Sequence, residues 1–232
     1  IACRKPNLLL QDEPQEVMEV AMAEGSSCTI KQQVLKSLSE VLVDEERKNM
    51  LKSGSKASRT GKKFTETADD SKVKTDEMGL TGGLMQRYLA QLLSLSHDNN
   101  ADVRLDALNL IRVILRQGLV HPMECVAHVV ALTGDQEPRV RAQAEKMVAY
   151  LDEKHHSLLV LRSVEGVLKS YEFQRRVFET ESAFVPQKSG GNVCAFRQLY
   201  SSLQSKKSES KQFVTSLLNK IVDSIKDLSN HS

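Results

Sequence analysis

The chain has 232 residues, of which 32 are Lys or Arg and 30 are Asp or Glu, so its formal net charge is +2. A charge this close to balance excludes a molecule-wide field that would commit the chain to nucleic acid or to acidic partners, although it permits local basic patches. No apolar run approaches the roughly 18 residues that a membrane-spanning helix needs, so we expect no membrane partner. Tryptophan is absent and aromatic residues make up 4% of the chain, which favours a core of aliphatic side chains on packed helices.

The four cysteines are far apart in the sequence and form no CxxC pair: Cys3, Cys28, Cys125 and Cys194. The N-terminal residues include no sustained apolar stretch of the kind that a signal peptide has. Together these features favour a reduced cytosolic or nuclear compartment over a disulfide framework. The sequence begins with Ile instead of Met, and its last predicted helix runs almost to the final residue, so we expect it to be a piece of a longer protein.

Residues 1–52 are predicted to form a degenerate helix pair. In the first helix, Val17 and Val20 lie at helical spacing after Pro14, and Gly25 then interrupts the pattern. In the second helix, apolar residues recur at the spacing of one buried face: Ile30, Val34, Leu35, Leu38, Val41 and Leu42. The second helix therefore resembles the second helix of the repeats that follow, whereas the first one matches them poorly.

Residues 53–82 differ sharply in composition from the segments on either side. Small, polar and charged residues dominate, and Phe64 is the only aromatic residue. Such a segment cannot bury enough apolar surface to offset the entropy that it would lose on ordering. We therefore predict a disordered, charged insertion, of the kind that solenoid proteins accommodate in loops between repeats.

Residues 83–155 are predicted to contain the same helix pair twice. When Val103 is placed over Val140, the shift is 140 − 103 = 37 residues, and the turn and both apolar faces keep register. The recurring positions are Asp98, Val103, Arg104 and Ala107 in the first copy, and Asp135, Val140, Arg141 and Ala144 in the second. A period of this length, with helical apolar spacing on both sides of a polar turn, is typical of an α-solenoid of stacked antiparallel helix pairs.

The ends of the repeated helices carry local signals. Asn100 is a suitable N-cap for the second helix of the first copy, and Gly118 is a suitable residue to end it. Pro122 suits the first turn of the next helix, because its missing N–H would have no helical partner there.

Arg104 and Arg141 recur at the same place in both copies, which raises the question whether they bind a ligand. Their equal placement beside a core valine favours a structural ladder instead. In that interpretation each arginine pairs with an aspartate of an inter-helix turn, such as Asp98 or Asp135.

Residues 156–232 are predicted to form further solenoid helices outside the repeat register. A long helix over residues 156–178 is expected to turn its large apolar residues inward: Leu158, Leu161, Val164, Val167, Leu168 and Tyr171. Residues 186–192 are expected to form a loop, followed by helices over residues 193–204 and 208–228. Because the sequence has no alternating apolar and polar strand pattern, the predicted fold class is all-α.

No motif for catalysis or for cofactor binding survives inspection of the sequence. His121, Cys125 and His128 share a helical face at i, +4 and +7, so a metal site is conceivable. Against a metal, His121 precedes the predicted helix start and no fourth ligand lies nearby. Capping or exposed histidines and a packed cysteine are the preferred explanation, so we predict a non-enzymatic chain without cofactor or metal.

Basic residues outnumber acidic ones by nine to five within residues 162–211. The candidates for contacting DNA phosphates are Arg175 and Arg176 on the long helix, and Lys206 and Lys207 between the last two helices. Such contacts are independent of DNA sequence and weaken with salt. A solvated helix face explains the same residues and is favoured from the sequence alone.

The two copies resemble HEAT repeats, with the aspartate, the Val-Arg pair and the alanine in that family's positions. Beyond this, residues 84–155 resemble the C-terminal HEAT region of the Nipped-B-like cohesin loaders. The runs that carry the resemblance are QRYL (86–89), VR and ALN (within 103–109), QGLVHP (117–122) and the acidic-Pro turn (135–138). With SVEGVLKSYEFQ (163–174) and parts of the N-terminal segment, it covers about residues 1–52 and 84–204.

The resemblance implies a nuclear, chromatin-associated scaffold that helps to load cohesin onto chromatin and so promotes sister chromatid cohesion. It implies contacts with cohesin subunits and double-stranded DNA, and stimulation of an ATPase that belongs to cohesin. It also implies a small helical partner, held by an N-terminal part of the loader that this sequence does not include. No residue motif carries a cohesin or DNA contact onto a particular position. The alternative is a generic HEAT-repeat adaptor in transport or phosphatase regulation.

Overall fold

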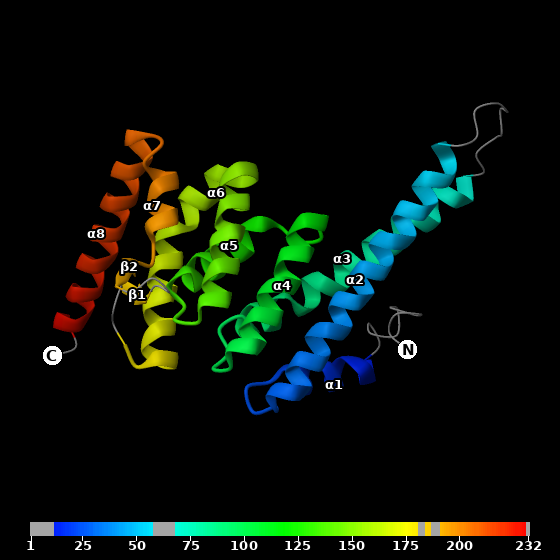
Figure 1. Ribbon diagram of the computed structural model, residues 1–232, viewed down its shortest axis with the longest axis horizontal. Coiled ribbons are helices and arrows are strands. Elements are labelled where there is room, and N and C mark those ends of the chain that lie inside the picture. The colour runs from blue at the N-terminus through cyan, green and yellow to red at the C-terminus, as the bar shows by residue number, and fades with distance from the viewer. Residues whose placement is uncertain (1–11, 58–67, 181–183, 187–190, 231–232) are drawn as a thin grey trace. The chain divides into compact units, whose positions relative to one another are not determined.

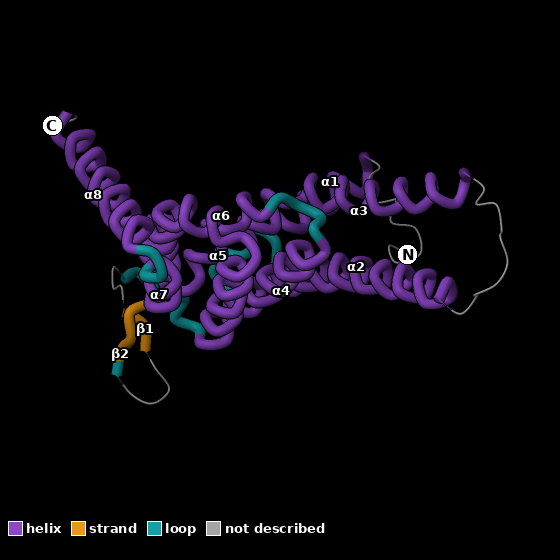
Figure 2. Tube along the Cα trace, turned by 90° about the horizontal axis from the view of Figure 1, so that it is seen from above, coloured by secondary structure: helices purple, strands orange, loops and turns teal. Residues whose placement is uncertain are grey.

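The computed structural model describes residues 12–57, 68–180, 184–186 and 191–230 (Figure 1). The elements in chain order are α1 (Asp12–Met22), α2 (Cys28–Ala57), α3 (Ala68–Leu95), α4 (Ala101–Gln117), α5 (Pro122–Ala131), the 3-10 turn η2 (Leu132–Gly134), α6 (Pro138–Phe178), β1 (Phe184–Pro186), β2 (Asn192–Cys194), α7 (Arg197–Leu203) and α8 (Lys207–Asn230). Within those ranges, strands occur only in one short hairpin, which Figure 2 shows in orange against purple helices. The predicted all-α, solenoid-type fold class is confirmed.

The chain divides into two compact units, Ile1–Val120 and His121–Ser232. The division falls between the two predicted repeats. The first unit holds one copy of the repeated helix pair, α3 with α4. The second unit holds the other copy, α5 with the first part of α6.

In the first unit, α2 packs on α4 and buries four apolar residues: Leu35, Leu38, Val41 and Leu42. Ile30 was predicted to belong to the same buried stripe, but its side chain is 50% exposed, so that part of the prediction was wrong. The neighbouring Lys31 turns inward in its place and is 3% exposed. A buried lysine is tolerated only where its ammonium group has partners, and Lys31 has them.

The first copy of the repeat has the predicted helix ends. The side chain of Asn100 accepts hydrogen bonds from the backbone N–H groups of Asp102 and Val103, so Asn100 is the N-cap of α4. Gly118 ends the helix in the left-handed conformation, with φ of 68°, which a residue without Cβ adopts most readily. The predicted face of α4 is buried: Val103, Ala107, Leu110, Ile111 and Ile114.

Helical backbone extends into the segment 53–82 from both sides. α2 continues to Ala57 and α3 begins at Ala68. Thr81, near the end of this segment, is buried and its hydroxyl donates a hydrogen bond to Glu45 of α2. The rest of the predicted disordered insertion, residues 58–67, lies outside the described residues.

In the second unit, α5 begins at Pro122 as predicted, with His121 as its N-cap. α6 is broken near its middle, because His155 has non-helical backbone angles, φ −142° and ψ 39°. The part before this kink is the second helix of the second repeat. It buries the predicted face: Val140, Ala144, Met147, Val148 and Leu151. The kink lies at residue 155, where the sequence indicated the end of the repeats.

The part of α6 after the kink buries a different face from the predicted one. Leu161 is 62% exposed and Tyr171 is also exposed, so the prediction was wrong for these two residues. The other four predicted residues are half-buried: Leu158, Val164, Val167 and Leu168. Half of the buried residues are small, namely Ser163, Gly166 and Ser170, and the others are Leu159, Phe173 and Gln174. A Cβ atom built on Gly166 would lie 2.5 Å from Cβ of Val130, so only a small residue lets α5 approach this closely.

The first helix after the predicted loop begins later than predicted. Residues 193 and 194 were expected to open a helix, but β2 pairs antiparallel with β1, with Val193 opposite Val185. A β-branched residue favours such an extended conformation. α7 therefore begins at Arg197. α8 packs on α6 and α7, and none of its side chains from Lys207 to Asp223 is buried.

Candidate nucleic-acid interface

Arg104 closes the turn of the first repeat. Its guanidinium Nη1 donates hydrogen bonds to the backbone carbonyl oxygens of Asp98 and Asn99, at 2.9 Å and 3.0 Å. The arginine is 1% exposed. A buried guanidinium needs such acceptors, since an unsatisfied buried charge is costly. Asp98 was predicted to pair with Arg104, and the arginine contacts the backbone carbonyl oxygen of this aspartate.

Arg141 makes the equivalent contact in the second repeat. Its Nη1 donates to the carbonyl oxygens of Asp135 and Gln136, at 2.6 Å and 3.5 Å. The side chain of Asp135 turns back to its own loop, where Oδ1 accepts the backbone N–H of Glu137 at 2.8 Å. Each arginine thus ties the second helix of its pair to the turn that precedes it.

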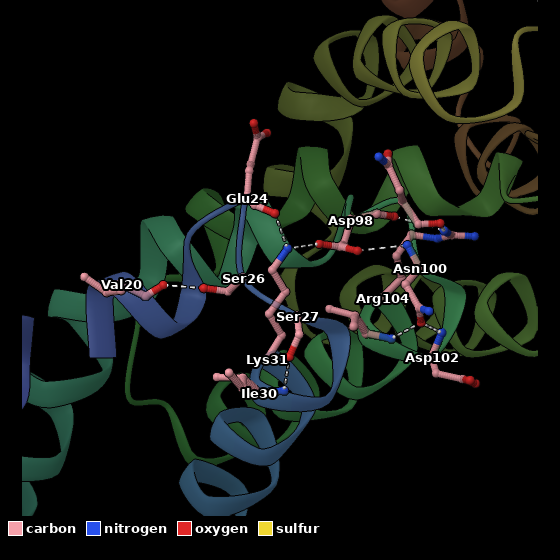
Figure 3. A network of polar contacts seen from close by, with 12 residues as sticks. Val20, Glu24, Ser26, Ser27, Ile30, Lys31, Asp98, Asn100, Asp102 and Arg104 are labelled. Carbon is pink, nitrogen blue, oxygen red and sulfur yellow. Dashed lines mark hydrogen bonds and ion pairs between the residues drawn. The ribbon is translucent and has the colours of Figure 1, made fainter. Parts of the chain in front are cut away.

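Lys31 takes the corresponding position in α2, which sequence analysis missed. A shift of 104 − 31 = 73 residues places Lys31 on Arg104, and the lysine was not recognised because it is chemically different. Its Nζ donates to the carbonyl oxygen of Glu24 at 3.0 Å and to Asp98 Oδ2 at 2.7 Å (Figure 3). The same shift places Ile30, Leu38 and Val41 on Val103, Ile111 and Ile114, and this register was the signal that could have identified the lysine.

Arg175 and Arg176, two of the DNA-contact candidates, lie in the last turn of α6 and are exposed. The guanidinium of Arg175 lies 5.6 Å from the ring centroid of Tyr171, which is one helical turn earlier. At this distance the cation is attracted to the electron-rich face of the ring, which is a cation–π interaction. Cations are also favoured at the C-terminal end of a helix, where the backbone carbonyl dipoles point outward.

Lys206 and Lys207, the other candidates, lie at the start of α8 and are exposed. Lys206 Nζ forms an ion pair with Glu209 Oε1 at 2.9 Å. The positive end of the helix dipole adds to the positive potential of these side chains, and this combination attracts anions such as phosphate.

The two pairs of candidates do not form one patch. Glu209 in the first turn of α8 lies 2.8 Å from His156, so the lysines sit near the start of the second part of α6. Arg175 follows His156 by 175 − 156 = 19 residues, which is about 28 Å along a helix that rises 1.5 Å per residue. Figure 1 shows the start of α8 and the end of α6 at opposite ends of this helix pair. We call them the arginine cluster (Arg175, Arg176) and the lysine cluster (Lys206, Lys207).

His121 and Cys125, two of the residues considered as metal ligands, have structural roles instead. His121 caps α5, because its Nδ1 accepts the backbone N–H of Met123. Cys125 is buried, and burial raises the pKa of its thiol to about 12, with a smaller contribution from Glu124. The described part of the chain contains no group of three or more His, Cys, Asp or Glu side chains that could hold a metal ion. Its helices also include none that is long and apolar enough to cross a membrane.

Capped helix pairs with a buried basic residue closing each turn define an α-helical repeat protein of the solenoid class. Its second unit exposes basic clusters at two separated points. Residues 81–232 match the Nipped-B family model described as "Sister chromatid cohesion C-terminus". This match covers more than half of the chain, so the protein belongs to that family, and the resemblance noted from the sequence is confirmed.

The chain is similar to curated proteins of the same family. It is 31% identical to Nipped-B-like protein A of Danio rerio over 203 residues, which are 87% of this chain and 8% of that protein. It is 29% identical to Nipped-B-like protein of Homo sapiens over 226 residues, covering 95% of this chain and 8% of that protein. Identity to sister chromatid cohesion protein 2 of Saccharomyces cerevisiae is 28% over 149 residues, 62% of this chain and 10% of that protein. The chain thus spans about a tenth or less of the length of these relatives.

Proposed function

We propose that this chain is part of a non-enzymatic cohesin loader, a scaffold that promotes the loading of cohesin onto DNA and thereby sister chromatid cohesion. The observation that carries the proposal is the family match over residues 81–232, which includes both exposed basic clusters. The relatives named above are cohesion proteins, which agrees with a nuclear, chromatin-associated role. The family relationship favours this function over a generic adaptor in transport or phosphatase regulation.

In this function the second unit contacts double-stranded DNA through its phosphates. The arginine cluster and the lysine cluster each expose two cations. About 28 Å of α6 lies between His156, near the lysine cluster, and Arg175, which lets the clusters reach phosphates on different segments of one duplex, whose helical repeat is about 34 Å. Tyr171 holds Arg175 by its ring face, which reduces the side-chain freedom that the arginine would lose on binding. Backbone contacts of this kind bind without sequence preference, as loading at many chromosomal sites requires.

The loader stimulates ATP hydrolysis by contacting cohesin, because the ATPase is part of cohesin. The contribution of this chain is its helix pairs, each held by a buried basic residue at its turn. We infer that Lys31, Arg104 and Arg141 are structural residues, because each is buried against the carbonyl oxygens of its own turn. The small helical partner is assigned to another part of the longer loader.

DNA binding is tested by fluorescence anisotropy of the purified chain with a labelled duplex over a series of salt concentrations. Reversing the lysine cluster (K206E with K207E) or the arginine cluster (R175E with R176E) should each weaken binding about tenfold at low salt. Each reversal should also reduce the salt slope by roughly one for every phosphate that the variant can no longer neutralise. The matched control is R112E with K146E, which changes two exposed basic residues of the repeats. Equal affinity and slope in both cluster variants and the control would refute the DNA contact.

The loader assignment has its own test. The longer protein that contains this chain should co-purify with cohesin subunits and raise their chromatin-bound fraction. The two cluster variants in that protein should lower the DNA-dependent part of cohesin ATPase stimulation and leave cohesin binding intact. Capture of importin cargo or of a phosphatase catalytic subunit in place of cohesin would support the adaptor function instead.

A further inference from the structure

His156 joins three segments of the second unit through its two ring nitrogens. Its Nδ1 lies 2.6 Å from Asp152 Oδ1, and its Nε2 lies 2.8 Å from Glu209 Oε2. Asp152 precedes the kink at His155, whereas Glu209 belongs to the first turn of α8. One imidazole therefore connects both parts of α6 with the start of α8.

This geometry is that of a protonated imidazole. A neutral histidine has one N–H group, so one of its two nitrogens would present a lone pair to a carboxylate oxygen. The imidazolium form donates from both nitrogens, and each donation to a carboxylate is assisted by charge. Lys206 Nζ donates to the second oxygen of Glu209 at 2.9 Å, which completes a chain of alternating charges.

Beyond its first turn, α8 faces a cavity that it shares with the second part of α6. α8 runs in the same direction as the second part of α6, because Glu209 in its first turn meets His156 at the start of that part, and both helices run down the view from there (Figure 1). Phe213 and Lys220 of α8 line one cavity with Leu161 and Leu168 of α6. This cavity between the two helices measures about 640 Å³. Apolar packing between α6 and α8 is therefore incomplete over this stretch, and Glu209 adds a polar attachment at the start of α8.

We propose that His156 is a proton-dependent clamp, which holds the first turn of α8 against the kink of α6 and releases it when the imidazolium loses its proton. The device consists of His156, Asp152 and Glu209, with Lys206 as the outer partner. Release would free α8 to move relative to α6 and widen the cavity between them. The proposal does not depend on the DNA contact, since its test follows α8 itself.

The direction of the pH dependence follows from the two groups. The hydrogen bonds to Asp152 and then to Glu209 raise the pKa of His156 above its ordinary value of 6.5, against a smaller opposing effect of burial. Lys206 and then His156 lower the pKa of Glu209 below its ordinary value of 4.5. A raised histidine pKa contributes stability that is complete below 6.5 and is lost as the pH rises through the folded-state value. The clamp is therefore closed between pH 4.5 and pH 6.5, the ordinary pKa values of the glutamate and the histidine, and it opens as the pH rises further.

Other charged or titratable groups lie on the elements packed against α6. On α6 itself, His155 lies next to the clamp, with its ring 6.4 Å from that of Tyr150. Among the side chains that the structure describes, the remaining groups on the packed helices are Glu124, Cys125 and His128 of α5, Arg197 and Tyr200 of α7, and Lys207, Lys211, Lys220 and Asp223 of α8. The charges that act on the pKa of His156 are those of Asp152 and Glu209, so these two set its titration.

Amide hydrogen exchange of the whole chain tests the clamp. After correction for intrinsic exchange, protection of α8 should be about two- to fivefold lower near pH 8.5 than near pH 6, the factor expected for a partly exposed ion pair. Protection in α5 should not change over the same range. In H156Q, α8 should show the low protection at both pH values, while H155Q, the matched control, should keep the wild-type dependence.

A pH-independent α8 in the wild type would overturn the proposal, as would loss of the dependence in H155Q. Circular dichroism of H156Q checks that the variant is folded. If it is not, E209Q decides the question, because its neutral amide still accepts a hydrogen bond from the imidazole. The pKa of His156, followed by NMR, should move down toward 6.5 in E209Q, and an unchanged value would refute the clamp.

Discussion

Lys31 Nζ lies 2.7 Å from Asp98 Oδ2, although the two residues are 67 positions apart in the sequence. The other oxygen of Asp98 accepts the backbone N–H of Asn100, the N-cap of α4. The carboxylate of Asp98 thereby links the degenerate helix pair to the first turn of the regular repeat (Figure 3). Both side chains are largely withdrawn from water, at 4% and 11% exposed. Their ion pair therefore connects successive helix pairs of the first unit.

Replacing Lys31 by methionine should reduce the free energy of unfolding by about 3 kcal/mol, because it leaves a mostly buried carboxylate without its cation. Urea denaturation followed by circular dichroism measures the change. The control is K36M on the exposed side of the same helix, which should lie within about 0.5 kcal/mol of the wild type. Equal effects of K31M and K36M would mean that the ion pair does not stabilise the first unit.

Substitution of Gly166 by alanine should destabilise the second unit by about 1–3 kcal/mol, because the new methyl group would overlap Val130 and force α5 and α6 apart. G83A is the matched control. Gly83 lies inside α3, and a Cβ atom built on it would have no neighbouring side chain or other helix within 4 Å. That change should increase stability by up to about 1 kcal/mol, the helix propensity of alanine over glycine. Thermal unfolding of the two variants should thus shift in opposite directions, and a shared direction would contradict the packing argument.

Removal of the N-cap side chain in N100A should cost about 1 kcal/mol, because the N–H groups of Asp102 and Val103 lose their acceptor. Asn99 is the adjacent exposed residue, and the hydrogen bond that it receives from Arg104 goes to its backbone carbonyl, which N99A retains. N99A should therefore be close to neutral in the same denaturation assay. A cost for N99A as large as that for N100A would show that the cap is not the source of the effect.

Cys125 should resist alkylation in the folded chain. With a thiol pKa of about 12, only about one molecule in ten thousand carries the thiolate at pH 8, and the side chain is also inaccessible. Cys28 and Cys194 are exposed and should react with iodoacetamide, as mass spectrometry of tryptic peptides would show. Modification of Cys125 at the rate of Cys28 without denaturant would mean that α5 opens readily.

The local features of the fold were predictable because their causes are local. Asn100 caps α4 with its own side chain, and Gly118 ends that helix through its freedom to adopt positive φ. Pro122 opens α5, where a missing N–H costs nothing. The repeat register also followed from the chain alone, since equivalent faces of α4 and α6 carry the same residue types. The exposed basic residues could be named on the same grounds.

The tertiary structure decided which side of a helix faces inward and which distant residues meet. The period of α6 after the kink shows where its large apolar residues lie, yet the buried side is the one with Ser163, Gly166 and Ser170. This side is buried because α5 packs closely against it: Val130 of α5 would overlap any side chain larger than that of glycine at position 166. The pairing of Lys31 with Asp98 and the separation of the two basic clusters likewise depend on how helices pack. The sequence by itself thus determined both ends of α4, the start of α5, the repeat register and the family, whereas the packing distance between helices determined the buried faces and the arrangement of charges.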